Sequence, residues 1–422
     1  MAWDRVAPPW GLTHASRSFD SPSPARSLAA SIPPPLPVSS ILHRSLAARL
    51  PTAVHGEGMR LTLDNGQEVL DASGGAAVAC LGHGNARVAA AIGAQASRMA
   101  YAHTGFFTSA PAEALADLLV GRRPGGLTHA FFVSSGSEAV ESALKLARQY
   151  HVERGEPQRV HYVSRRQSYH GASLASLAVG GNLGRRRPYE DILMGNVSRV
   201  SPCFAYHGQG ADETDAAYVA RLAQELEAEF VRIGPQRVIA FLAETVVGAT
   251  AGCVTAVPGY FAAVREVCDR HGVLLILDEI MCGMGRTGTV HAWEQEGVVP
   301  DIQVIAKGMG GGYVPIGGLL VSARVIDGLS AGSGAFVHGH TYQAHPVACA
   351  GALEVQRIIA EDGLVARAAS RGAYLRERLG EVLGQHPHVG DIRGRGLFLA
   401  VEFVEDRALR RPFPAAARVH ER

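Results

Sequence analysis

The apolar positions of this chain follow two different periods, and these periods predict its secondary structure. Apolar residues at helical spacing in PAEALADLLVG, EAVESALKLARQYHVERG and YFAAVREVCDRHG predict helices over 111–121, 138–155 and 260–272. Short apolar runs predict buried strands, and these runs lie at 129–135, 159–164, 237–244, 273–277 and 302–308. Strands and helices that alternate in this way are typical of an α/β fold with a mainly parallel central sheet.

The two ends of the chain have patterns of their own. In GMRLTLDNGQEVLD, two alternating runs surround Asp64-Asn65-Gly66, which predicts a hairpin over 58–71. Residues 351–384 have a helical pattern, and residues 390–406 read as a loop that enters a strand, so we expect a second, smaller α+β unit. Residues 1–36 are rich in Ser and Pro and poor in acid, which predicts a disordered extension, with a targeting peptide as the alternative.

Composition and charge narrow the class of protein. The 422 residues are 47% hydrophobic, which suits a sizeable core, and the net charge of +1 gives no basic footprint for nucleic acid. No apolar run approaches the roughly 20 residues that span a bilayer, so we expect no membrane partner. The six cysteines form no C-x-x-C pair and have no His at metal spacing, which predicts reduced thiols and no metal site. We expect a cytoplasmic location, or a mitochondrial one if the extension is a targeting peptide.

One glycine motif invites a nicotinamide interpretation. Gly283, Gly285 and Gly288 in LLILDEIMCGMGRTG have the G-x-G-x-x-G spacing of a dinucleotide-binding loop. That loop must follow its strand directly, whereas Asp278 intervenes here, and Asp301 precedes the next strand instead of ending it. The spacing therefore argues against a nicotinamide dehydrogenase, and we expect the glycines to turn the backbone away from a crowded site.

The lysine content points to a different chemistry. The chain has only two lysines, Lys145 within a helical pattern and Lys307 at the end of a predicted strand. A lysine amine can lose its proton and act as a nucleophile, which arginine cannot do. Asp278, 29 positions earlier, also ends a buried strand. A lysine and an acid that face one crevice are what pyridoxal phosphate (PLP) requires, since the lysine binds its aldehyde and the acid keeps its ring nitrogen protonated.

Other segments supply the remaining contacts for such a cofactor. Ser135, Gly136 and Ser137 lie between a strand and a helix, where free N–H groups favour a phosphate, although S-G-S-E also reads as a helix cap. Tyr169 could stack on a flat ring, and Ile280 could press on the other face. Ordinary packing is the alternative for both.

These motifs together resemble the class III (subgroup II) aminotransferases of the fold-type I PLP enzymes. LDASGG…LGHG, SSGSEA, YHG, LDEI…G-GRTG, AKG and HGHTY occur in the order of that family, from about residue 40 onward. The resemblance implies a small-domain segment at 37–90, a large PLP-binding domain at 91–345 and the rest of the small domain at 346–422. It also implies that this last part ends early, because family members continue with a further helix and strand.

The resemblance assigns roles to individual residues. It makes Lys307 the Schiff-base lysine and Asp278 the partner of the ring nitrogen, and it implies a homodimer. The other cofactor contacts that it implies are Ser135, Gly136, Ser137, Tyr169, His170, Ile280 and, reaching the cofactor of the partner subunit, Thr341.

The substrates implied are an amine or amino acid as donor and a 2-oxo acid as acceptor, in a ping-pong reaction. Arg393 in the R-G-x-G motif is expected to bind a substrate carboxylate, and Glu244 to neutralise it when an amine must enter. Met281-Cys282 stand where the ornithine enzymes carry Gln-Thr, which is closer to the ω-amino-acid and diaminopelargonate branches. A PLP-dependent decarboxylase or aminomutase and a non-catalytic PLP-binding relative are the alternatives.

Overall fold

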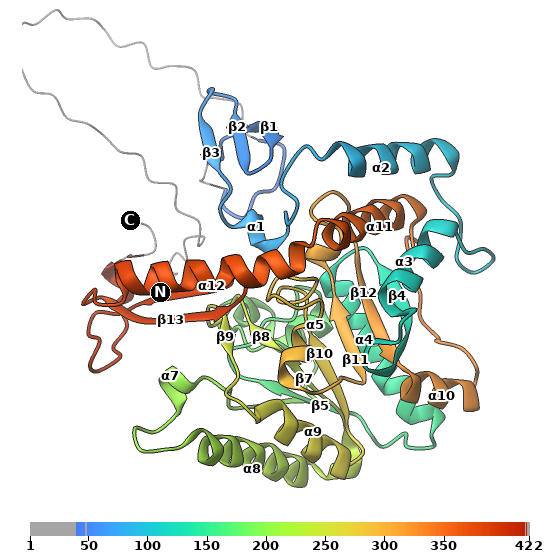
Figure 1. The fold of residues 1–422 in the computed structure, drawn as a ribbon. Coiled ribbons are helices and arrows are strands. Elements are labelled where there is room, and N and C mark those ends of the chain that lie inside the picture. The colour runs from blue at the N-terminus through green and yellow to red at the C-terminus, as the bar shows by residue number, and fades with distance from the viewer. Residues whose placement is uncertain (1–38, 47–48, 418, 420–422) are drawn as a thin grey trace, which may run out of the picture.

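The computed structural model describes residues 39–46, 49–417 and 419, and these form a large α/β layer with smaller β units beside it (Figure 1). The extension predicted over residues 1–36 lies outside the described residues. The domain boundaries at 90/91 and 345/346 stay a prediction. Within the described part of the chain, no helix combines the length and the apolar character needed to cross a membrane.

A seven-stranded sheet forms the centre of the molecule, in the order β4-β12-β11-β10-β7-β5-β6. Its strands are parallel except for β12, which pairs antiparallel with both β11 and β4, so the predicted mainly parallel sheet is confirmed. The strands are β4 (Leu127–Val133), β5 (His161–Arg165), β6 (Val197–Val200), β7 (Val238–Glu244), β10 (Leu274–Asp278), β11 (Ile302–Ile305) and β12 (Gly317–Ser322).

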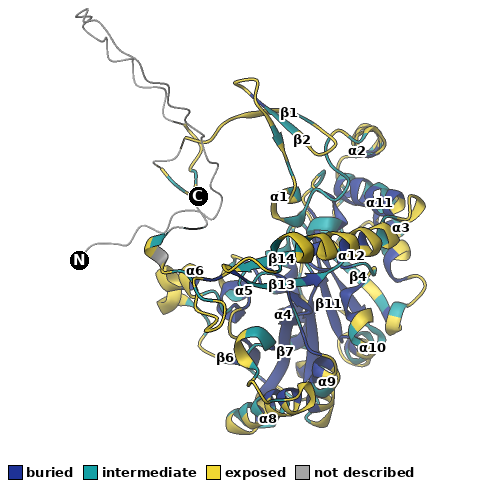
Figure 2. Ribbon diagram, turned by 60° about the vertical axis from the view of Figure 1, so that its left-hand side comes forward, coloured by how far each residue is buried: buried dark blue, intermediate teal, exposed yellow. Residues whose placement is uncertain are grey.

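Helices cover both faces of this sheet, which is why its inner strands read as continuous apolar runs. Every residue of β7, β10 and β11 is buried, and Figure 2 shows β7 and β11 in dark blue. Side chains alternate between two cores along β10, with Leu275 and Leu277 on one face and Leu274 and Ile276 on the other. The first core packs against α3 (Ala110–Val120), α8 (Asp215–Ile233), α9 (Tyr260–Arg270) and α11 (Pro346–Glu361), and the second against α4 (Gly136–Glu153) and α10 (Ala323–Ala331).

The N-terminal part carries the predicted hairpin, β2 (Arg60–Leu63) and β3 (Glu68–Leu70), and β1 (Ala53–Glu57) extends it to three antiparallel strands. The turn between β2 and β3 contains Gly66 at φ +80°, a conformation that glycine adopts without strain. The chain then continues through α1 (Gly74–Ala77) and α2 (Ala86–Arg98). Short connecting elements elsewhere are α5 (Leu174–Val179), α6 (Leu183–Arg186), α7 (Ala205–Gly208), β8 (Val246–Val247) and β9 (Val254–Thr255).

The C-terminal part differs from its prediction in two respects. The helical stretch is two helices, α11 and α12 (Leu364–Leu383), because Gly363 at φ +61° interrupts it. The segment expected as a loop is instead β13 (Val389–Arg395), which pairs antiparallel with β14 (Phe398–Phe403). The prediction failed because β13 contains two glycines and three charged residues, whereas its stability comes from pairing and ion pairs rather than from apolar alternation.

Candidate active site

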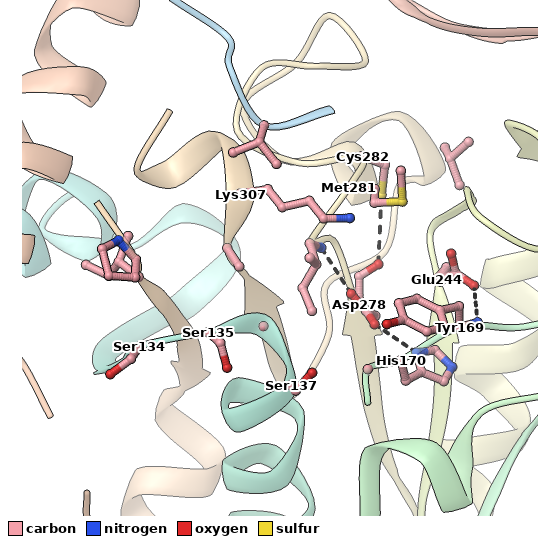
Figure 3. Close-up of a pocket in the computed structure, with 18 of the residues that line it drawn as sticks. Ser134, Ser135, Ser137, Tyr169, His170, Glu244, Asp278, Met281, Cys282 and Lys307 are labelled. Atoms are coloured by element: carbon pink, nitrogen blue, oxygen red, sulfur yellow. Dashed lines mark hydrogen bonds and ion pairs between the residues drawn. The ribbon is translucent and has the colours of Figure 1, made fainter. Parts of the chain in front are cut away.

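Two neighbouring strands bring Asp278 and Lys307 into one cavity. Asp278 is the last residue of β10 and pairs with Val304 of β11, while Lys307 lies two residues beyond the end of β11. Because parallel strands end at the same edge of a sheet, both side chains reach the same crevice. They line a cavity of about 260 Å³, and Figure 3 shows the Lys307 amine directed into it above Asp278.

Asp278 is held from two sides in a buried position, with 3% of its surface exposed. Its Oδ2 lies 2.8 Å from Nδ1 of His170, and its Oδ1 accepts the N–H of Ile280 at 3.0 Å. Both carboxylate oxygens therefore have a partner within the protein. The acid is therefore fixed in orientation and available to a cationic group in the cavity.

Lys307 has an unusual backbone and a perturbed amine. Its φ of +44° lies in the left-handed region, which costs a side-chain-bearing residue conformational energy and occurs most often at functional sites. Burial lowers the pKa of its amine from the ordinary value, and the carboxylates of Asp278 and Glu244 oppose that shift. A larger share of neutral amine is thus present near neutral pH than an exposed lysine would have.

The loop between β4 and α4 forms the other end of the cavity. Ser135 caps α4 by accepting the N–H of Glu138 at 3.2 Å, and Glu138 accepts the N–H of Ser134 at 2.7 Å, so the predicted helix cap is present. A Cβ on Gly136 would lie 2.9 Å from the side chain of Ile280, so a larger residue would require Ile280 to move. Ser137 also lines the cavity. The first N–H groups of α4 and these hydroxyls can hold an anion.

Tyr169 and Glu244 complete the wall opposite this loop. Oε1 of Glu244 accepts the N–H of Tyr169 at 2.9 Å, and Oε2 accepts the N–H of Gly248 at 2.9 Å. Burial raises the pKa of the Glu244 carboxyl, while the charge of His170 lowers it. The guanidinium of Arg185 lies 5.0 Å from the centre of the Tyr169 ring. Acid, base, aromatic ring and anion cradle thus meet in one cavity.

Comparison with known proteins identifies the family. Residues 45–420 match the family model for class-III aminotransferases. An uncharacterised aminotransferase of Schizosaccharomyces pombe is 53% identical over 371 residues, which are 88% of this chain and 81% of that protein. The chain belongs to the class-III aminotransferase family.

Solved structures agree with this assignment. An (S)-enantioselective ω-transaminase from Thermomicrobium roseum has a TM-score of 0.83 and 39% identity, over 87% of this chain and 81% of that one. An amine transaminase from an uncultivated Pseudomonas species, in its PLP-bound form, has a TM-score of 0.86 and 36% identity, over 90% and 88% of the two chains. The class-III aminotransferase described here therefore has the fold of PLP-dependent transaminases, and PLP is its cofactor.

The cavity fits this cofactor. The first N–H groups of α4 with Ser135 and Ser137 beside them suit the phosphate, and buried Asp278 suits a protonated ring nitrogen. Lys307 is the one lysine of the two that lines the cavity, because Lys145 lies exposed on α4 and contacts Nδ1 of His338 at 2.8 Å. Each part of PLP therefore has a chemically matched group.

Two predicted site residues do not line this cavity. Thr341 is exposed, and its carbonyl accepts the hydroxyl of Tyr101 at 2.9 Å. Arg393 is held elsewhere by the carboxylates of Glu402 at 2.5 Å and Asp391 at 3.0 Å. Its remaining nitrogens donate to the carbonyls of 251 and 252 at 2.6 and 2.7 Å. Arg393 and Glu244 do not form the expected pair, because the donors of Arg393 are directed at the β13–β14 hairpin and at the carbonyls of residues 251 and 252.

The sequence analysis gave no role to Glu279, although it is among the most buried acids of the aminotransferase. Its two oxygens accept from Thr245, Gln303 and the N–H groups of Ala292 and Trp293, at 2.7 to 2.9 Å. Burial raises the pKa of this carboxyl to about 7, although the four hydrogen-bond donors lower it. Glu279 thereby ties the segment after Asp278 to β11 and to the turn at 292–296. Its place beside Asp278 was the only signal in the sequence.

The three glycines of the G-x-G-x-x-G spacing lie in the segment that follows Asp278 and Glu279. Gly285 and Gly288 have φ values of +89° and +95°, which only glycine adopts easily. A Cβ on Gly283 would approach the Glu279 carbonyl to 2.9 Å. The three glycines turn the chain tightly beside the buried acid, as the sequence analysis expected.

Proposed function

We propose that Lys307 is the amine that binds PLP covalently, that Asp278 is the partner of its ring nitrogen, and that Ser135, Gly136 and Ser137 receive its phosphate. Tyr169, His170 and Ile280 are assigned to the remaining cofactor contacts. The observation that carries the proposal is the meeting of Lys307 and Asp278 in one cavity that ends at the N-terminus of α4. A lysine and an acid that lay in separate cavities would not support the proposal.

The roles of these residues follow from their surroundings. PLP, when bound, supplies an electron sink for the charge left on a substrate carbon that loses its proton. Nζ of Lys307 takes that proton as a neutral amine and later returns it, which burial favours by lowering its pKa. Asp278 is held in one orientation by His170 and by the N–H of Ile280. The two half-reactions of a ping-pong exchange use the same groups in opposite order.

Replacement of Lys307 by Ala tests the assignment. The variant should transaminate at least about 100-fold more slowly, because it lacks the proton-transferring amine, and should lose the visible absorbance of covalently bound PLP. Lys145→Ala is the matched control, since it removes the other lysine from an exposed surface. A Lys307→Ala enzyme with both properties intact would refute the proposal.

We place the enzyme in the ω-type branch, with an amine or amino acid as donor and a 2-oxo acid as acceptor. Met281 and Cys282 line the cavity, where they leave an apolar wall beside Lys307. The two solved relatives described above are an ω-transaminase and an amine transaminase. Arg393 remains the proposed partner of a substrate carboxylate, and Glu244 the group that neutralises it when an amine must enter. In the structure Arg393 is paired with Glu402 and Asp391.

We also propose a homodimer in which Thr341 serves the partner's site. Phe106, Phe107 and Val337 are 81%, 66% and 76% exposed, and the ring centres of Tyr101 and Tyr342 are 6.0 Å apart, which joins the two segments. Exposed apolar surface of this kind marks interaction sites. Sedimentation velocity should therefore give a dimer at micromolar concentration, and a monomer would contradict the proposal. The cytoplasmic location remains part of the proposal.

A further inference from the structure

A second cavity, of about 200 Å³, lies beside the first and has the opposite charge character. Its lining includes three arginines, Arg286, Arg367 and Arg371, and no acidic residue. The lining of the first cavity includes two acids, Asp278 and Glu244, with Lys307 as its cation. The arginines of the second cavity therefore attract an anion.

The two cavities have one lining residue in common. Met281 lines both of them. Two pairs of residues that are adjacent in sequence are also divided between the cavities. Lys307 and Cys282 line the first cavity, and the residues that follow them, Gly308 and Gly283, line the second. A methionine side chain is unbranched and changes shape easily. Movement of this side chain is the route by which a molecule bound at Lys307 would extend toward the second cavity.

The three arginines have no partner of their own. None makes a side-chain hydrogen bond or ion pair with any residue in the described part of the chain. Arg286 is half-buried, and its charge acts on the Cys80 thiol, which donates to the carbonyl of Gly308 at 3.6 Å. Its charge therefore lies close to the residue that follows Lys307. Arg395, by contrast with these three arginines, forms an ion pair with Glu296.

We propose that the second cavity binds the far carboxylate of a dicarboxylic substrate, with Arg286 as its principal partner. This inference rests on the proposed role of Lys307, because the reacting carbon of the same molecule must lie there. Arginine forms two parallel hydrogen bonds with a carboxylate, which suits this task. Apolar side chains of the cavity cover the methylene groups between the two ends, and these are Ile359, Leu364, Val365 and Leu397.

Binding of adipate and hexanoate to the PLP-loaded enzyme, measured by titration calorimetry, tests the carboxylate site without turnover. Adipate should bind at least about tenfold more tightly than hexanoate, since a charge-assisted hydrogen bond contributes about 1.5–3 kcal/mol. Arg286→Gln should bring the two affinities within about twofold, and Arg371→Gln should reduce the difference. Arg376→Gln is the matched control, because Arg376 is exposed on the same helix α12 and does not line this cavity. Equal affinities in the unmodified enzyme, or an unchanged ratio in Arg286→Gln, would overturn the proposal.

Kinetics separate this proposal from that of the catalytic lysine. Arg286→Gln should raise KM for 2-oxoadipate at least about tenfold while leaving KM for 2-oxohexanoate and both kcat values within about twofold. Adipate should compete with 2-oxohexanoate, because both occupy the Lys307 cavity. Non-competitive inhibition would mean a separate anion site and would overturn the shared-substrate proposal. If transamination of 2-oxohexanoate proceeds but no discrimination is seen, only this inference fails; if Lys307→Ala retains activity, the catalytic assignment fails.

Discussion

Nδ1 of His170 lies 2.8 Å from Oδ2 of Asp278, and both side chains are buried. The second carboxylate oxygen of Asp278 is occupied by the N–H of Ile280. Asp278 cannot turn without losing one of these two bonds. The histidine thus fixes the direction of the acid in the cavity.

His170→Leu should weaken PLP binding by about 10- to 100-fold, because Asp278 would lose a hydrogen bond to a buried charge. His170→Asn should retain part of the affinity, since its amide can still donate a hydrogen bond to the carboxylate. Fluorescence titration of the cofactor-free protein with PLP measures both variants. An unchanged affinity in His170→Leu would show that Asp278 needs no support from the histidine.

The amine of Lys307 should react at lower pH than an ordinary lysine. Burial lowers its pKa, so its neutral, nucleophilic form appears as pH rises before that of N-acetyl-lysine amide. Trinitrobenzenesulfonate labelling of the cofactor-free protein, mapped by mass spectrometry, gives the midpoint. Asp278→Asn should move that midpoint lower still, because the carboxylate raises the pKa of the lysine. A midpoint at or above that of the free amine would contradict the lowered pKa.

The central layer and the pair Asp278–Lys307 could be predicted from sequence for a simple reason. Continuous apolar runs identify strands buried on both faces, and the ends of parallel strands meet at one edge. The antiparallel β12 escaped prediction, because GGLLVS resembles any short apolar run and its direction depends on pairing with β4 and β11.

Long-range contacts account for the features of the site that the sequence did not indicate. The contacts of Arg393 with the carbonyls of residues 251 and 252 could not be read from its motif, because these residues are remote in sequence. The donors to Glu279 come from four separate positions between 245 and 303, and no local pattern brings them together.

Glu279→Gln should lower the free energy of unfolding by about 1–3 kcal/mol at pH 8. An amide offers one accepting oxygen, so its NH₂ group would face donors such as the Ala292 N–H and leave them unpaired. Urea unfolding measures the difference. Glu294→Gln is the control, since Glu294 is exposed in the turn that Glu279 anchors, and it should change stability by less than about 0.5 kcal/mol. Equal losses in both variants would argue against an anchoring role for Glu279.

At Lys307, the left-handed backbone favours glycine, whereas the proposed chemistry requires a lysine. At φ +44° a glycine would sit with less strain, so selection for a sturdy fold alone would favour replacing the lysine. A related protein that no longer needs the proposed activity would therefore be expected to lose this lysine early. If Lys307 has the proposed catalytic role, the residue at position 307 in related sequences would therefore distinguish active enzymes from inactive relatives.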